Sequence, residues 1–138
     1  MARMHLRLRT LLLPVLLVGW ATPALADPCE GKLPAPGTRF SGVVRYVGDG
    51  DSLCVGPARQ PERWIEIRLA DFYARELNAP GGREAKRVLE TLTRGRTLVC
   101  RAGKRSYDRV VARCTLGGVA LGDRLRAAGV AEGGRGRR

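Results

Sequence analysis

The sequence of 138 residues contains a single histidine, His5, which lies close to the N-terminus. Ser-His-Asp triads, Cys-His pairs and zinc sites built on histidine all need an imidazole. If the N-terminal segment is removed, as argued below, the remaining chain has none. Any catalysis would then rely on carboxylates, arginines and a hard metal ion.

The chain also lacks a hydrophobic run long enough to cross a membrane. Its longest apolar run, residues 11–20, follows three arginines and precedes 24–26 (ALA), the small-x-small pattern that signal peptidase cleaves. A membrane anchor is the weaker alternative, because this run is about half of the roughly 20 residues that a bilayer requires. We predict that 1–26 is a cleaved signal peptide, that the protein is exported to the periplasm or the extracellular space, and that the mature form has no membrane span.

Acidic residues are scarce relative to basic ones. After cleavage before Asp27, the chain contains 22 Lys and Arg residues and 13 Asp and Glu residues, which gives a net charge of +9. Such a charge suits a polyanion such as nucleic acid, an anionic membrane surface or a sulfated sugar. Only three of the basic residues are lysines, so arginine-rich codon usage is an alternative origin of the excess, and charge alone identifies no partner.

No Cys-x-x-Cys pair is present, and without histidine a zinc site is disfavoured. The four cysteines all follow residue 26, and an even number of cysteines in an exported protein indicates disulfides. Three pairings are possible. We favour Cys100 with Cys114, because their segments are expected to form neighbouring strands of a hairpin, and Cys29 with Cys54.

Short segments rich in β-branched and aromatic residues predict strands over 40–47, 53–55, 64–69, 97–101 and 110–116. The Pro- and Gly-containing segment 27–38 predicts an irregular leader. The polar segment 103–108 is expected to separate the last two strands.

Between Gly82 and Gly95, Ala85, Val88, Leu89 and Leu92 have the spacing of one face of an amphipathic helix. A second, short helix is predicted over 121–128. We therefore expect an α+β fold over 39–131: a small five-stranded OB-fold β-barrel, with a helix between strands 3 and 4 and a short C-terminal helix. The basic tail 132–138 is expected to be disordered.

Two aspartates, Asp49 and Asp51, flank a glycine at a predicted hairpin turn, where they could offer oxygen ligands to a hard cation such as Ca²⁺. A simple turn is the competing interpretation. Arg68, Glu76 and Arg109 each have an ordinary surface explanation, but together with Asp51 they match the needs of phosphodiester hydrolysis. That reaction requires cations at the phosphate oxygens, a metal or base for the nucleophile and donors for the developing charge.

Four segments, in order, resemble successive motifs of the thermonuclease, or staphylococcal nuclease-like, family: 43–52 (VVRYVGDGDS), 67–70 (IRLA), 82–85 (GREA) and 107–109 (YDR). The resemblance covers about 40–131, most of the mature chain. Each motif is weak by itself, and their common order gives the resemblance its weight.

The resemblance implies roles for individual residues. Asp51 would be a calcium ligand and Asp49 a supporting carboxylate near the ion. Arg68 and Arg109 would hold the scissile phosphate, and Glu76 would orient or deprotonate the attacking water.

Tyr107 matches a tyrosine that contacts a nucleotide phosphate in the family. The family has an OB barrel and cleaves single-stranded DNA and RNA with Ca²⁺, so nucleic acid is the expected substrate and Ca²⁺ the expected cofactor. Independently of the resemblance, we expect a monomer.

The sequence departs from the family pattern near the expected metal. An ungapped match puts Tyr73 at a second calcium-ligand aspartate, and a phenol cannot replace a carboxylate there at neutral pH. Asp71 is the candidate replacement. Asp108 stands where the family has a glycine before the second arginine, and it adds a negative charge beside the expected phosphate site.

The leading hypothesis is an exported metal-dependent nuclease. Tyr73 motivates an alternative of another class, a catalytically silent OB-fold module that binds nucleic acid or another polyanion. A structural, envelope-associated disulfide domain is a third reading, but it leaves the order of the motifs unexplained.

Overall fold

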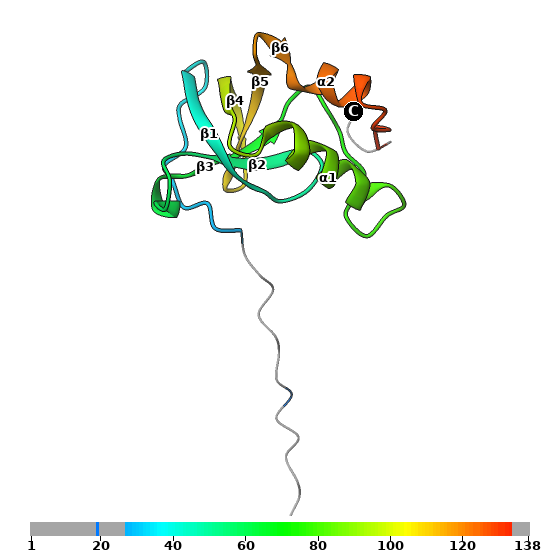
Figure 1. Ribbon diagram of the computed structural model, residues 1–138. Coiled ribbons are helices and arrows are strands. Elements are labelled where there is room, and N and C mark those ends of the chain that lie inside the picture. The colour runs from blue at the N-terminus through cyan, green and yellow to red at the C-terminus, as the bar shows by residue number, and fades with distance from the viewer. Residues whose placement is uncertain (1–18, 20–26, 134–138) are drawn as a thin grey trace, which may run out of the picture.

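The structure is a computed structural model that describes Gly19 and residues 27–133 (Figure 1). Apart from Gly19, the predicted signal peptide lies outside the described residues. No helix within the described part is both long and apolar enough to cross a membrane. The elements are strands β1 (Arg39–Val47), β2 (Ser52–Val55), β3 (Ile65–Leu69), β4 (Thr97–Ser106), β5 (Arg109–Leu116) and β6 (Val119–Ala120), helices α1 (Gly82–Thr93) and α2 (Leu121–Ala127), and the 3-10 helix η1 (Pro61–Arg63).

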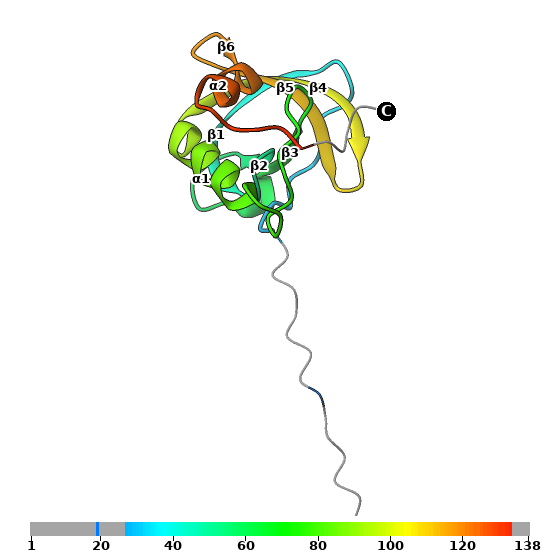
Figure 2. The same ribbon diagram turned by 90° about the vertical axis from the view of Figure 1, so that its right-hand side faces the viewer.

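The strands form one sheet in the order β3-β2-β1-β4-β5-β6, with antiparallel neighbours. A further, parallel pairing joins β3 to β5 through three residue pairs, Ile67–Leu69 with Val110–Ala112. The sheet therefore curls back on itself, with a closure that is short and partial (Figure 2). The α+β class is confirmed. The prediction of five strands missed β6, whose two residues are too few to give a periodic signal.

The core lies inside this curled sheet and under the two helices. In β3, Ile67 and Leu69 face the core while Glu66 and Arg68 occupy the alternate face, as the two-residue period of a strand requires. Helix α1 buries Ala85 and Leu89 against the sheet. The predicted helix in this region is confirmed, and it begins after Gly81, whose φ of 87° favours glycine.

The hairpin of β4 and β5 differs from the prediction. We expected 103–108 to separate the strands, but β4 continues to Ser106 and only a tight turn remains. An irregularity between Ala102 and Arg105 lets the polar end of β4 keep its pairing with β5. In the last four residues of β4, buried apolar residues do not alternate with exposed polar ones, because neither face of this part of the hairpin is buried against the core.

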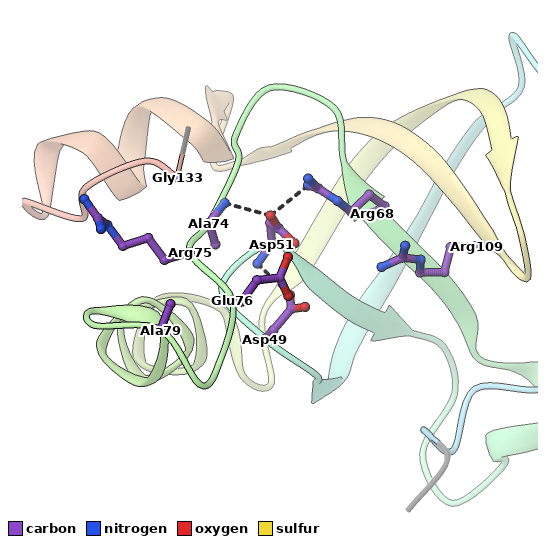
Figure 3. A pocket seen from close by; sticks show the side chains of 9 residues that line it. All are labelled: Asp49, Asp51, Arg68, Ala74, Arg75, Glu76, Ala79, Arg109 and Gly133. Carbon is purple, nitrogen blue, oxygen red and sulfur yellow. Dashed lines mark hydrogen bonds and ion pairs between the residues drawn. The ribbon is translucent and has the colours of Figure 1, made fainter. Parts of the chain in front are cut away.

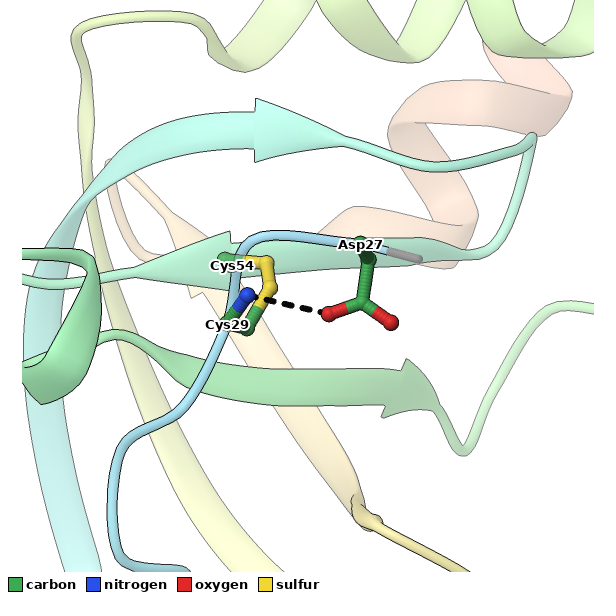
Figure 4. Close-up of side chains that lie close together, drawn as sticks. All are labelled: Asp27, Cys29 and Cys54. Atoms are coloured by element: carbon green, nitrogen blue, oxygen red, sulfur yellow. Dashed lines mark hydrogen bonds between the residues drawn. A yellow bond between two sulfur atoms is a disulfide. The ribbon is translucent and has the colours of Figure 1, made fainter. Parts of the chain in front are cut away.

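The two predicted disulfides are confirmed. Cys100 and Cys114 lie directly opposite each other on β4 and β5. The second bridge, between Cys29 and Cys54, fixes the irregular leader to β2 (Figure 4).

The expected disorder from residue 132 onward is wrong for its first two residues. Glu132 forms an isolated β-bridge with Ala74, and the Gly133 N–H donates to the Tyr73 carbonyl at 2.7 Å. A long-range backbone pairing of this kind leaves no trace in the composition of the tail. Residues 134–138 lie outside the described part.

Candidate functional site

The turn between β1 and β2 is organised by the side chain of Asp49. Its Oδ1 accepts hydrogen bonds from the Asp51 N–H at 3.0 Å and from the Ser52 hydroxyl at 2.8 Å. This is the local pattern by which aspartate stabilises turns. Gly50 is required at the centre, because a Cβ there would lie 2.5 Å from the Ala74 Cβ and 2.6 Å from the Ala85 Cβ.

Asp51 lies at the centre of the site and is only 5% exposed. Its Oδ2 accepts the Ala74 N–H at 2.7 Å and lies 3.0 Å from Nη1 of Arg68 (Figure 3). The same Arg68 nitrogen donates to the carbonyls of Leu69 and Phe72. Arg68 is therefore held in place by β3 and by the segment that follows it.

A cavity of about 330 Å³ opens beside Asp51. Five of the predicted site residues line it: Asp49, Asp51, Arg68, Glu76 and Arg109. Four residues that the sequence did not single out complete the lining: Ala74, Arg75, Ala79 and Gly133. These residues come from the β1–β2 turn, β3, the β3–α1 segment, the start of β5 and the tail. Their convergence therefore depends on the tertiary fold.

The strand register explains why the two arginines face the same cavity. Arg68 of β3 pairs with Val111 of β5, and Arg109 lies two residues before Val111, on the same face of its strand. In Figure 3 the Arg109 side chain extends toward the two aspartates and the Glu76 carboxylate lies beside them, whereas Arg75 extends away. Glu76 is exposed, so water can reach its carboxylate.

The backbone around Glu76 is packed tightly against the start of α1. A Cβ on Gly82 would lie 1.8 Å from the Glu76 carbonyl oxygen, so only glycine permits this approach. The Ala79 N–H donates to the same carbonyl at 2.9 Å. Gly82, which the sequence showed only as part of a motif, thus sets the position of the glutamate.

Burial and, second, the Asp49 carboxylate raise the pKa of Asp51 from 3.8 to about 7, although Arg68 opposes both effects. Burial acts to raise the pKa of Asp49 as well. Hydrogen bonds from the Asp51 backbone and side chain and from Ser52 outweigh burial and lower it. Near pH 7 Asp51 is therefore partly protonated, and a bound cation could take the place of that proton.

No protein-family model matches this chain, and no curated protein matches it. The resemblance to thermonucleases consequently remains a prediction.

The oxygen ligands present suit a hydrated cation better than a closed protein cage. Asp49 and Asp51 supply two carboxylates, and Mg²⁺ or Ca²⁺ can complete such a shell with water. Among the described residues, the groups of three acidic or cysteine side chains whose ligand atoms lie within 4.8 Å of one another are both outside this cavity.

Asp71, the predicted replacement for the second ligand, does not line the cavity. Its Oδ2 accepts the Gly122 N–H at 3.1 Å, at the start of α2, and its Oδ1 is buried without a partner. The chain leaves β3 at this point, so the two-residue period no longer indicates where the side chain points. The structure therefore gives Asp71 a place beside α2 rather than beside Asp51.

Tyr73 and Tyr107 also lie outside the cavity lining. The Tyr73 ring lies 5.0 Å from the Arg68 guanidinium carbon, a cation–π contact that supports the arginine from outside the cavity. Tyr107 occupies the β4–β5 turn with a φ of 58° and is 96% exposed. A contact between Tyr107 and a bound polymer stays a prediction.

Glu66 is the acidic residue that the sequence reasoning missed. It lies on the same face of β3 as Arg68, is 8% exposed and lines a second cavity with Asp49 and Arg109. Burial, followed by the charges of Asp27 and Asp108, raises its pKa to about 7, although Arg109 opposes the rise. The alternation of β3 was the signal that could have placed Glu66 beside Arg68.

Proposed function

We propose that this protein is an exported, divalent-metal-dependent nuclease that hydrolyses phosphodiester bonds of DNA or RNA. The observation that carries the proposal is the convergence of a carboxylate pair, two arginines and an accessible glutamate on one cavity. The pairing of β3 with β5 supports the finer proposal of a five-stranded OB-type barrel, with β6 as an addition.

The cavity contains both carboxylates, which could hold a cation, and arginines, which could contact an anionic substrate. A divalent ion held by Asp49 and Asp51 would supply Lewis-acid stabilisation of charge on the phosphate. Arg109 lines the cavity without an ion pair to any described carboxylate. It can therefore approach a non-bridging phosphate oxygen. Arg68 faces the same oxygens while it remains anchored on Asp51.

In this proposal Glu76 would accept the proton of the attacking water. The water oxygen forms a bond to phosphorus, the bond from phosphorus to the leaving sugar oxygen breaks, and a proton from solvent completes the released hydroxyl. The arginines would stabilise the additional negative charge of the pentacoordinate state. General-base catalysis of this kind contributes roughly 10²–10⁴-fold in rate.

The test is cleavage of denatured DNA by the purified protein with Ca²⁺, Mg²⁺ or Mn²⁺. We expect cleavage that a chelator abolishes, and a loss of about 10²-fold or more in kcat for Arg68→Ala. Arg87→Ala is the matched control, because Arg87 is an exposed arginine of α1 outside the cavity. Absence of cleavage, or cleavage that survives both the chelator and Arg68→Ala, would contradict the proposal.

One observation favours a second candidate function, a catalytically silent module that binds nucleic acid. Tyr73 occupies the position of an expected acidic ligand, and Asp71 does not replace it in the cavity. Tight DNA binding without turnover, weakening steeply as salt rises, would support this function. Binding that is indifferent to salt would exclude it.

A further inference from the structure

A second group of acidic side chains lies outside the proposed active cavity. Oxygen atoms of Asp27, Glu66 and Asp108 all lie within 4.8 Å of one another. They come from the leader, from β3 and from the β4–β5 turn, three segments that are far apart in the sequence. Like charges brought this close repel one another unless a cation or protons neutralise them.

The buried carboxylate of Glu66 is a second, independent observation that points to a bound ligand. The residue is 8% exposed, and its Oε2 is buried with no hydrogen-bond partner among the described residues. A buried polar atom without a partner is costly, and the great majority of such atoms in proteins are satisfied. The carboxylate lies next to two other carboxylates and lines a cavity of about 320 Å³.

The position of Asp27 is fixed rather than incidental. The Cys29–Cys54 disulfide attaches the leader to β2, and the Cys29 N–H donates to Asp27 Oδ1 at 3.0 Å (Figure 4). The Gly31 N–H donates to the Trp64 carbonyl and holds the leader near the start of β3. One Asp27 oxygen remains for a ligand, whereas the two sulfurs beside it are bonded to each other and cannot act as thiolate ligands.

From this geometry we propose a divalent-cation site formed by Asp27, Glu66 and Asp108, distinct from the cavity around Asp51. Three carboxylates suit a hard, oxygen-seeking ion such as Ca²⁺ or Mn²⁺, with water completing the shell. Charge supports the assignment, because the three carboxylates and Asp49 outnumber Arg109, the basic residue that lines this cavity.

A cation there would join the leader, β3 and the turn before β5. Asp108 precedes Arg109, which lines both cavities, so the ion would fix the start of β5 beside the proposed active cavity. This inference goes beyond the proposed nuclease activity and does not depend on it.

Terbium(III), a luminescent substitute for Ca²⁺, tests the site directly. Tyr46 lines the same cavity and can sensitise Tb³⁺ emission when it is excited. The titration is done on protein expressed from the full chain, with its N-terminus read by intact mass. An Asp51→Asn background removes the buried carboxylate of the other candidate pair and leaves Asp49, which lines both cavities.

We expect saturable Tb³⁺ binding in Asp51→Asn, displaced by Ca²⁺, with the Kd raised at least tenfold by adding either Glu66→Gln or Asp108→Asn. Adding Tyr46→Phe should lower the emission without changing the Kd. Glu62→Gln, an exposed glutamate in η1, is the matched control and should change neither.

An unchanged Kd after both Glu66→Gln and Asp108→Asn would overturn the site, as would the absence of binding in the Asp51→Asn background. Asp108 is exposed, so its substitution tests the site without disturbing the core. Nuclease activity of the unsubstituted protein is a separate readout, since absence of cleavage by that protein, with Tb³⁺ binding intact in Asp51→Asn, would overturn the proposed function alone.

Discussion

Replacing Asp51 with asparagine should make the metal-free protein more stable at alkaline pH, although it removes a residue proposed to bind the catalytic ion. Asp51 is almost fully buried, and its pKa lies at about 7 instead of 3.8. A carboxyl group whose folded pKa is raised costs stability when it ionises. The cost is absent below pH 3.8, grows as the pH rises to about 7 and then stays constant.

The size of the effect follows from the pKa shift. About three pH units at 1.36 kcal/mol each give an upper value of about 4 kcal/mol for the ionised group. Asparagine keeps an acceptor for the Ala74 N–H and offers an amide to Asp49, but Arg68 loses a charged partner. We therefore expect a net gain of about 2 kcal/mol, or a rise of roughly 10 °C in Tm.

The assay is thermal and guanidinium unfolding with a chelator present, at pH 5 and pH 8.5. The gain should appear at pH 8.5 and largely vanish at pH 5, where Asp51 is protonated in the folded state. Glu62→Gln, an exposed acidic residue, serves as the control and should behave as the parent at both values. An Asp51→Asn protein that is less stable than the parent at pH 8.5, or equally stabilised at both pH values, would show that ionisation of the buried Asp51 does not cost stability.

Three further predictions concern the same region and the disulfide framework. Gly50→Ala should destabilise the protein by about 1–3 kcal/mol and reduce any cleavage, because the new methyl group must displace Ala74 and Ala85 next to Asp51. Measurements of unfolding and of activity check this prediction. Replacing Cys100 and Cys114 together with serine should cost about 2–5 kcal/mol in guanidinium unfolding, and a smaller change than this would show that β4 and β5 need no bridge. Metal affinity measured by calorimetry should rise about tenfold per pH unit below pH 7, since one proton must leave Asp51 before the ion binds.

Much of the fold could be predicted from local patterns. Ile65, Ile67 and Leu69 alternate with polar residues and form a strand, and the spacing from Ala85 to Leu92 gives a helix. The pairing of Cys100 with Cys114 followed from the expected hairpin. These features depend on neighbours within a few residues, which is the range over which side-chain periodicity carries information.

The candidate site was predictable only as a set of residues. The motifs placed Asp51, Arg68, Glu76 and Arg109 in one hypothesis, and the structure brings them to one cavity. Asp71 has the carboxylate that a metal ligand needs, but its side chain does not point into the cavity. The backbone after β3 leaves the regular strand and turns this carboxylate toward α2.

Residue types and local periodicity were therefore enough to predict the members of the candidate site, most of the strands and helices that carry it, and the absence of an imidazole after residue 26. Which carboxylates are buried, and which of them lie close together, depends on the folded chain. Nothing in the local sequence distinguishes Glu66 from an ordinary exposed residue of a strand. Its pKa rises because it is buried with Asp27 and Asp108 beside it. Burial and charge repulsion depend on distances in space, and the pairing of β3 with β5 and the Cys29–Cys54 bridge set those distances here.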